Sequence, residues 1–153
     1  MATSKFITAA LLAASITPVQ AEDKASAASF QLAMQDHLRC HAAYSAVAEV
    51  TEAAGKPATS EEYTIRSKAE GMAAGAAAVW VMNLSPEGKE ALDGFNGKIF
   101  IETAKRGTLS DIEMGEGSLA ERIDAATKDC TDLSHMLSTQ MFLDELKKMQ
   151  EDK

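Results

Sequence analysis

Two histidines one helical turn apart are the residues whose types and spacing point most directly to chemistry. His37 and His41 lie at positions i and i+4, with Cys40 between them. On a helix, both imidazoles therefore project from one face. Imidazole is a common ligand for divalent transition metals, and its protonation between pH 5 and 8 also suits a proton sensor. We therefore consider His37 and His41 as metal ligands or as a proton-sensing pair.

A metal site needs more ligands than two histidines supply. His135 is the obvious third ligand, because a disulfide between Cys40 and Cys130 would bring its segment beside His37. On one continuous helix, however, His135 would lie about 140° around the axis from Cys130. The more frequent role of such histidines is structural, as hydrogen-bonded side chains lining a helix bundle. Methionine sulfur could supply Cu(I) ligands, although methionines at helical spacing usually fill cores; the candidates are Met34, Met136 and Met141.

The sequence contains none of the catalytic motifs that we sought. It has no nucleophile elbow, P-loop, His-Glu-x-x-His or EF-hand loop, and neither CxxC nor CxxCH. Its carboxylates are spread along helix faces, and an oxidised Cys40 would leave no activated nucleophile. We predict a non-enzymatic protein with no catalytic residue and no cofactor, and rank an enzyme of unknown class third among the functions considered.

The N-terminal segment has the three parts of a secretory signal peptide. Lys5 supplies a positive charge, residues 6–16 form an uncharged apolar run, and Val19 and Ala21 are the small residues of a cleavage site. The run is much shorter than the roughly 20 residues of a membrane-spanning helix. We predict a signal peptide over residues 1–21, cleavage before Glu22 and a periplasmic location, with extracellular release as the alternative.

Export affects the interpretation of the two cysteines. Cys40 and Cys130 are the only cysteines of the chain, and an oxidising compartment favours a disulfide between them. Two free buried thiols or one catalytic thiol are the alternatives. A bridge over so long a loop is worth roughly 4–5 kcal/mol in the chain-entropy model.

Hydrophobic spacing predicts four main helices and no strand. The first runs from about Phe30 to Ala54, where Gly55 and Pro57 end it, and the others begin near Thr59, Pro86 and Ser118. We expect the third helix to end near residues 105–107 and the last to continue unbroken, with a bend near residues 138–139. The expected buried stripe of the last helix is Leu119, Ile123, Ala126, Cys130, Leu133, Leu137 and Met141.

These elements predict an all-α fold. We expect one helical domain over residues 22–153, an antiparallel four-helix bundle closed by the Cys40–Cys130 disulfide. Residues 22–28 and 150–153 are expected to fray. After the signal peptide, no apolar stretch is long enough for a membrane span.

Composition narrows the choice of partner. The chain has 15 Lys and Arg against 23 Asp and Glu, a net charge of −8, which disfavours nucleic acid and anionic membranes. A signal peptide, an acidic helical domain and one disulfide are together similar to small periplasmic proteins as a class, such as acid-stress chaperones and inhibitor or immunity proteins. No motif identifies a family.

We predict a periplasmic protein-interaction module of chaperone, inhibitor or immunity type. Its protein partner is unidentified, a basic partner would suit its charge, and it would be a monomer or a homodimer. The alternative function is a metal or small-ligand binder, or a proton sensor, that uses His37 and His41.

Overall fold

The protein consists of helices joined by short turns. The structure, a computed structural model, describes residues 18–84 and 86–151. The predicted all-α fold is confirmed, because no strand occurs within these ranges. The elements are α1 (Pro18–Ala53), α2 (Pro57–Leu84), α3 (Pro86–Asp93), α4 (Gly97–Met114), α5 (Leu119–Thr127), the 3₁₀ helix η1 (Lys128–Thr131) and α6 (Leu133–Glu151).

The first helix begins earlier than the sequence predicted. α1 starts at Pro18 and includes residues 22–28; alanine, the best helix former, is frequent there. The signal peptide over residues 1–21 falls mostly on residues 1–17, which lie outside the described residues, so it stays a prediction. The expected fraying at either end of the domain is likewise a prediction.

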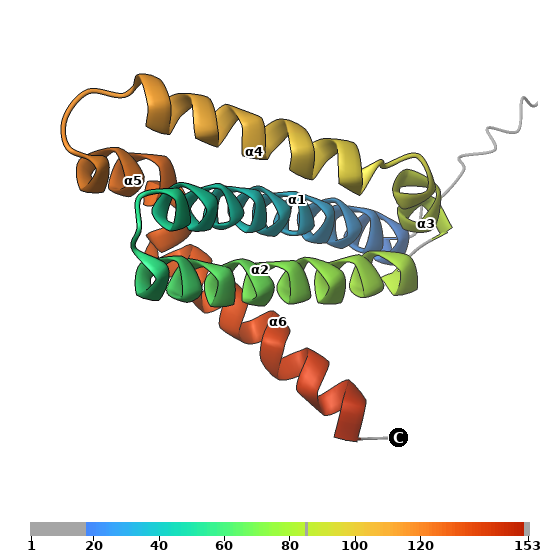
Figure 1. The fold of residues 1–153 in the computed structure, drawn as a ribbon. Helices are drawn as coiled ribbons and strands as arrows, with labels where there is room; N and C mark the ends of the chain where they lie inside the picture. The colour runs from blue at the N-terminus through green and yellow to red at the C-terminus, as the bar shows by residue number, and fades with distance from the viewer. Residues whose placement is uncertain (1–17, 85, 152–153) are drawn as a thin grey trace, which may run out of the picture.

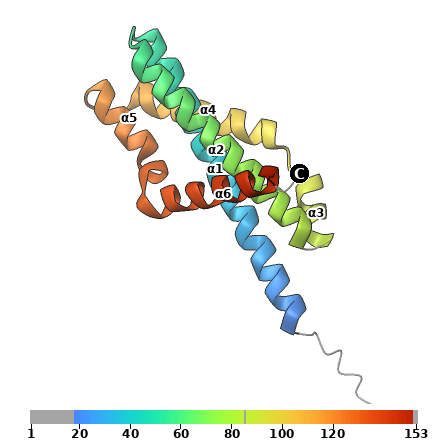
Figure 2. The same ribbon diagram turned by 90° about the horizontal axis from the view of Figure 1, so that it is seen from below.

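α1 is the central helix of the fold. α2 lies along it in the opposite direction, and α4 lies along another side of it (Figure 1). α6 packs on α2 but crosses it steeply, as Figure 2 shows. α3 lies near the far end of α2, and α5 with η1 connects α4 to α6. None of the described helices is both long and apolar enough to span a membrane.

Small side chains let α1 and α2 approach closely. The alanines that are almost fully buried on the two helices are Ala42, Ala43, Ala46, Ala73, Ala74, Ala76 and Ala77. Gly71 also lies at this contact, where an added Cβ would meet the ring of His41 at 3.3 Å. Larger side chains complete the interior at two places: Phe142 and Met34 on one side, and Val47, Ile112 and Ile123 on the other.

Most helix boundaries follow the predicted signals. Gly55 has φ 71° after the end of α1, and Ser118 and Glu121 form the predicted capping box of α5. The predicted third helix is instead two helices, α3 and α4, separated at residues 94–96. Its predicted end at residues 105–107 is wrong: α4 continues through Gly107 to Met114. The cost of one helical glycine, about 1 kcal/mol, is offset by the burial of Ile112.

The predicted last helix is also interrupted. η1 tightens the chain over residues 128–131, and Asp132 then leaves the helical region with ψ 141°. The Asp132 carboxylate accepts a hydrogen bond from the backbone N–H of Ser134 at 3.0 Å, so it caps the start of α6. Residues 138–139, where the sequence predicted a bend, lie within the uninterrupted helix α6.

Because of this break, the side of α6 that is buried differs from the stripe that the sequence predicted. The predicted core side chains Leu133, Leu137 and Met141 are 69%, 62% and 49% exposed, and that part of the prediction is wrong. Phe142 is instead the buried side chain of α6, with 1% exposure.

The predicted disulfide is confirmed. Cys40 of α1 and Cys130 of η1 are joined, with their Cα atoms 5.5 Å apart. Both cysteines are buried, and the hydroxyl of Tyr44 donates a hydrogen bond to the carbonyl oxygen of Cys130 at 3.0 Å. The bridge therefore fixes the segment that precedes α6 against the middle of α1.

Candidate functional site

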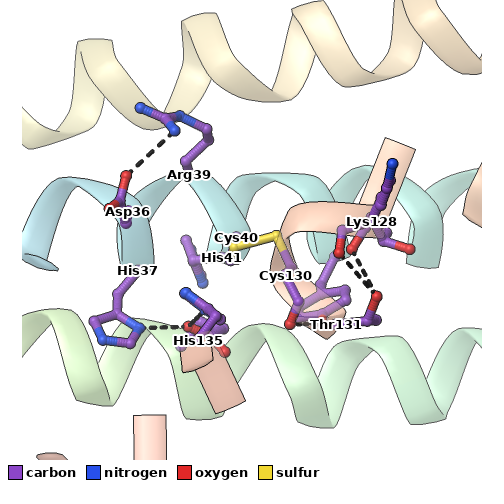
Figure 3. Close-up of a disulfide and its surroundings, with 12 residues drawn as sticks. Asp36, His37, Arg39, Cys40, His41, Lys128, Cys130, Thr131 and His135 are labelled. Atoms are coloured by element: carbon purple, nitrogen blue, oxygen red, sulfur yellow. Dashed lines mark hydrogen bonds and ion pairs between the residues drawn. A yellow bond between two sulfur atoms is a disulfide. The ribbon is translucent and has the colours of Figure 1, made fainter. Parts of the chain in front are cut away.

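A buried carboxylate between two histidines is the most distinctive polar feature of the described residues. Glu70 Oε2 lies 2.7 Å from His37 Nδ1 and 3.0 Å from His135 Nε2. The three residues come from α2, α1 and α6, and their potential ligand atoms all lie within 4.8 Å of one another. Figure 3 shows His37 pointing from α1 toward α2, with His135 close to it and the disulfide farther along α1. We call these three residues the His–Glu–His cluster.

Each member is positioned by its own helix. His37 is 1% exposed, and Met34 and Tyr44 are also buried on α1. Glu70 lies in a buried row of α2 with Ser67, Ala74, Ala77 and Val81, at the spacing of one helix face. His135 faces inward because α6 begins as a new helix after Asp132. The ring centroids of His135 and His37 are 4.8 Å apart.

Glu70 is ionised in the folded protein. Burial alone would raise the pKa of its carboxyl, but hydrogen bonds and charge interactions with His135 and His37 outweigh burial and lower the pKa to about 2. An ionised carboxylate can only accept hydrogen bonds. Both imidazoles therefore donate to Oε2, and the Thr139 hydroxyl donates to Oε1 at 3.0 Å.

Further partners hold the cluster in place. His37 Nε2 lies 3.1 Å from the Ser138 hydroxyl oxygen. The rings of His37 and Phe142 pack edge to face, with their centroids 5.4 Å apart. Ser138 and Thr139 are consecutive on α6, so one turn of that helix contacts both His37 and Glu70. The cluster is thus a hydrogen-bonded unit that spans three helices.

The structure separates the two histidines that the sequence paired. His41 Nδ1 donates a hydrogen bond to the carbonyl oxygen of Ser67 at 2.8 Å and also lies 2.9 Å from the Ser67 hydroxyl. His37 is grouped with Glu70 and His135, and His41 is outside that group. Two polar residues near them in sequence have other partners: the Tyr44 hydroxyl donates to the carbonyl oxygen of Cys130, and Asp36 pairs with Arg39.

Sequence reasoning missed Glu70 and gave a wrong reason against His135. A signal for Glu70 was present, since one acidic residue interrupts an alanine-rich face of α2. The objection to His135 assumed one helix through residue 135, and that assumption fails at the break after η1. The proposed sulfur ligands are elsewhere: Met34 is in the core with Phe142, and Met136 and Met141 are exposed.

A groove of about 470 Å³ opens onto the cluster. His37, His135 and Ser138 line it together with three acidic side chains, Asp36, Asp129 and Asp132. A second depression of about 320 Å³ lies between α2 and α6, and Glu70 lines it with Arg66, Met136 and Leu143 among others. The cluster therefore borders two solvent-accessible hollows, one lined by His37 and His135 and the other by Glu70.

The other face of α6 is unusually apolar. Leu133, Met136, Leu137 and Met141 are 49–69% exposed, and their spacing places them on one side of the helix. We call these four residues the outer face of α6.

Comparisons with known proteins leave the function to be argued from this geometry alone, because no family model, curated protein or solved structure matches the chain.

Proposed function

We propose that this protein is an exported, non-enzymatic module that binds another protein through the outer face of α6. The observation that carries the proposal is the row of Leu133, Met136, Leu137 and Met141 at helical spacing in solvent. Single exposed hydrophobic residues are ordinary on protein surfaces. A continuous row on one helix is typical of a surface that a partner covers.

The energetics favour such a contact. Full burial of one Leu or Met side chain contributes about 1.5–3 kcal/mol. Four half-exposed side chains could therefore contribute on the order of 5 kcal/mol before the costs of association. Methionine suits this role because its flexible side chain adapts to a partner's shape. The remaining α6 residues that point outward are charged or polar, which would supply the rim of an interface.

Charge narrows the class of partner. The chain has a net charge of −8, and the acidic side chains Asp129 and Asp132 line the groove beside the start of α6. A partner with an apolar helix or loop flanked by Lys or Arg would complement both features. This matches the predicted chaperone, inhibitor or immunity role, and a second copy of the chain is the alternative partner.

The finer architecture belongs to the same proposal. We regard the molecule as a distorted antiparallel four-helix bundle, in which α1, α2, α4 and α6 are the main helices. α6 has left the alignment because η1 and the disulfide redirect it. That departure is what exposes the outer face.

Affinity capture from a periplasmic extract tests the proposal. The bait proteins are the wild type, the double variant Leu137→Glu/Met141→Glu and a control, Ile99→Glu/Met114→Glu. The two control residues lie on α4 and are also large, exposed hydrophobic side chains. We expect one partner to be retained by the wild type and the control and lost by the α6 variant. Equal capture by all three baits would contradict the assigned face.

The oligomeric state is measured on the same proteins by light scattering. A wild-type dimer that the α6 variant converts to a monomer would identify the partner as a second copy. A wild-type monomer that captures nothing would overturn the proposed function.

A further inference from the structure

We propose that the His–Glu–His cluster binds one divalent transition-metal ion, with Zn²⁺ as the representative ion. The ligands are His37 Nδ1, Glu70 Oε2 and His135 Nε2. This inference is independent of the proposed partner, because it concerns the inner face of α6.

The ligand types fit this class of ion. Two imidazole nitrogens and one carboxylate oxygen form a mixed N/O set that suits Zn²⁺ and neighbouring first-row metals. Ca²⁺ and Mg²⁺ prefer oxygen ligands only. Soft thiolate chemistry is excluded at this point of the fold, because Cys40 and Cys130 are joined to each other.

The distances fit as well. Metal–ligand bonds of 2.0–2.1 Å at a tetrahedral angle place two ligand atoms roughly 3.3 Å apart. In the structure Glu70 Oε2 lies 2.7 Å from His37 Nδ1 and 3.0 Å from His135 Nε2, and all three potential ligand atoms lie within 4.8 Å of one another. Side-chain movements of between a few tenths of an ångström and about one ångström would therefore let all three atoms bind the same ion.

The protons can be accounted for at each imidazole. In the hydrogen-bonded form, each ring has a proton on the nitrogen that faces Glu70. The ion takes the place of these two protons: a ring that holds one proton moves it to its other nitrogen, and a ring that holds two releases one to water. For His37 the other nitrogen is Nε2, which lies 3.1 Å from the Ser138 hydroxyl oxygen and would donate to it.

The surroundings resemble the outer shell of a metal site. Ser138 would fix the tautomer of His37, and the Thr139 hydroxyl already holds Glu70 Oε1 at 3.0 Å. Such outer hydrogen bonds orient ligands and typically affect affinity 10–100-fold. The groove lined by His37 and His135 gives an ion and water a route to the cluster. Three protein ligands leave a fourth tetrahedral position for water.

Calorimetry on the oxidised chain without its signal peptide tests the site, after treatment with a chelator and its removal. We expect binding to saturate at one Zn²⁺ per chain and to resist excess Ca²⁺. His135→Ala should weaken binding by about a hundredfold or more, and Ser138→Ala by about tenfold. His41→Gln is the matched control, on the same helix but outside the cluster, and should bind like the wild type.

Two outcomes would overturn the inference. One is the absence of saturable Zn²⁺ binding, which would make the cluster a purely structural hydrogen-bond network. The other is binding that His135→Ala leaves unchanged or that Ca²⁺ displaces, which would locate the ion on the groove carboxylates.

The visible spectrum of the wild type loaded with Co²⁺ tests the site without any variant, so it still applies if a variant fails to fold. Four-coordinate Co²⁺ with nitrogen ligands absorbs strongly, whereas six-coordinate Co²⁺ on surface oxygens absorbs weakly. A weak spectrum in the wild type would also overturn the inference.

Discussion

Over residues 133–141, the two faces of α6 are arranged in the reverse of an ordinary amphipathic helix. The inner face places polar His135, Ser138 and Thr139 against α1 and α2, with Phe142 as its buried apolar side chain. The outer face exposes two leucines and two methionines to solvent. Over these residues, apolar area alone would favour the opposite orientation, whereas farther along the helix Phe142 and Leu146 pack in the core.

Glu70 explains why the polar face is inside. Its ionised carboxylate is 5% exposed and receives donors from His37, His135 and Thr139. Turning α6 over would remove two of these donors and the packing of Phe142. A buried charge that loses its partners costs about 3–5 kcal/mol, which matches or exceeds the gain from covering a few half-exposed side chains. The orientation of a helix can thus be decided by one buried charge.

The disulfide should have the largest effect, since it fixes η1 and therefore the face that α6 presents. We expect Cys40→Ser/Cys130→Ser to lower the free energy of unfolding by about 4–5 kcal/mol. Without the bridge, the unfolded chain regains the conformational entropy that closing a long loop removes. Urea unfolding of the oxidised wild type, the reduced wild type and the variant measures this. A stability equal to that of the oxidised protein would show that the inner-face contacts alone orient α6.

Phe142 tests the apolar contribution of the inner face. Phe142→Ala should cost about 3–4 kcal/mol, because it removes a buried ring that packs on Phe30 and His37. Denaturant midpoints at neutral pH give the value, with Leu143→Ala as the neighbouring half-buried control. Similar losses for the two variants would contradict the assignment of the inner face.

Glu70 tests the polar contribution of the inner face through pH. Its folded pKa of about 2 lies below the ordinary value of 4.5, so the unfolded state binds the proton more readily. The stabilisation is complete above about pH 4.5 and is lost as the pH falls toward 2. We expect an extra loss of about 3 kcal/mol as the pH falls through that interval, because each unit of pKa difference corresponds to about 1.4 kcal/mol.

The comparison that isolates this effect uses Glu70→Gln and metal-free protein. Glu70→Gln should lack the extra loss, whereas Glu61→Gln, which removes an exposed carboxyl of the same helix, should retain it. Urea unfolding at several pH values between 6 and 2 measures all three proteins. Parallel pH profiles for wild type and Glu70→Gln would show that the cluster is not what holds α6.

The outer face should have the smallest effect on stability. Leu137→Gln should change the free energy of unfolding by less than about 0.5 kcal/mol, because its side chain is 62% exposed. The same urea measurements apply. A loss comparable to that of Phe142→Ala would mean that Leu137 is buried in solution, either by α6 in another orientation or by a second copy.

The sequence was sufficient for the local features of this protein. Helical spacing predicted helices throughout, Gly55 and the Ser118–Glu121 capping box marked boundaries correctly, and the pairing of Cys40 with Cys130 followed from their being the only two cysteines. These features depend on a few neighbouring residues or on a simple count. Glu70 could also have been suspected, as an acid on an alanine-rich face.

Only the tertiary structure decided which distant residues meet. The break after η1 changes the direction and phase of α6, and this turns Leu137 outward and His135 inward. The same change replaces the predicted pair of His37 and His41 with the His–Glu–His cluster. Helical periodicity reports which residues share a face of one unbroken helix. Which face is buried depends on contacts across the fold, and here a disulfide and a buried carboxylate outweigh the apolar stripe.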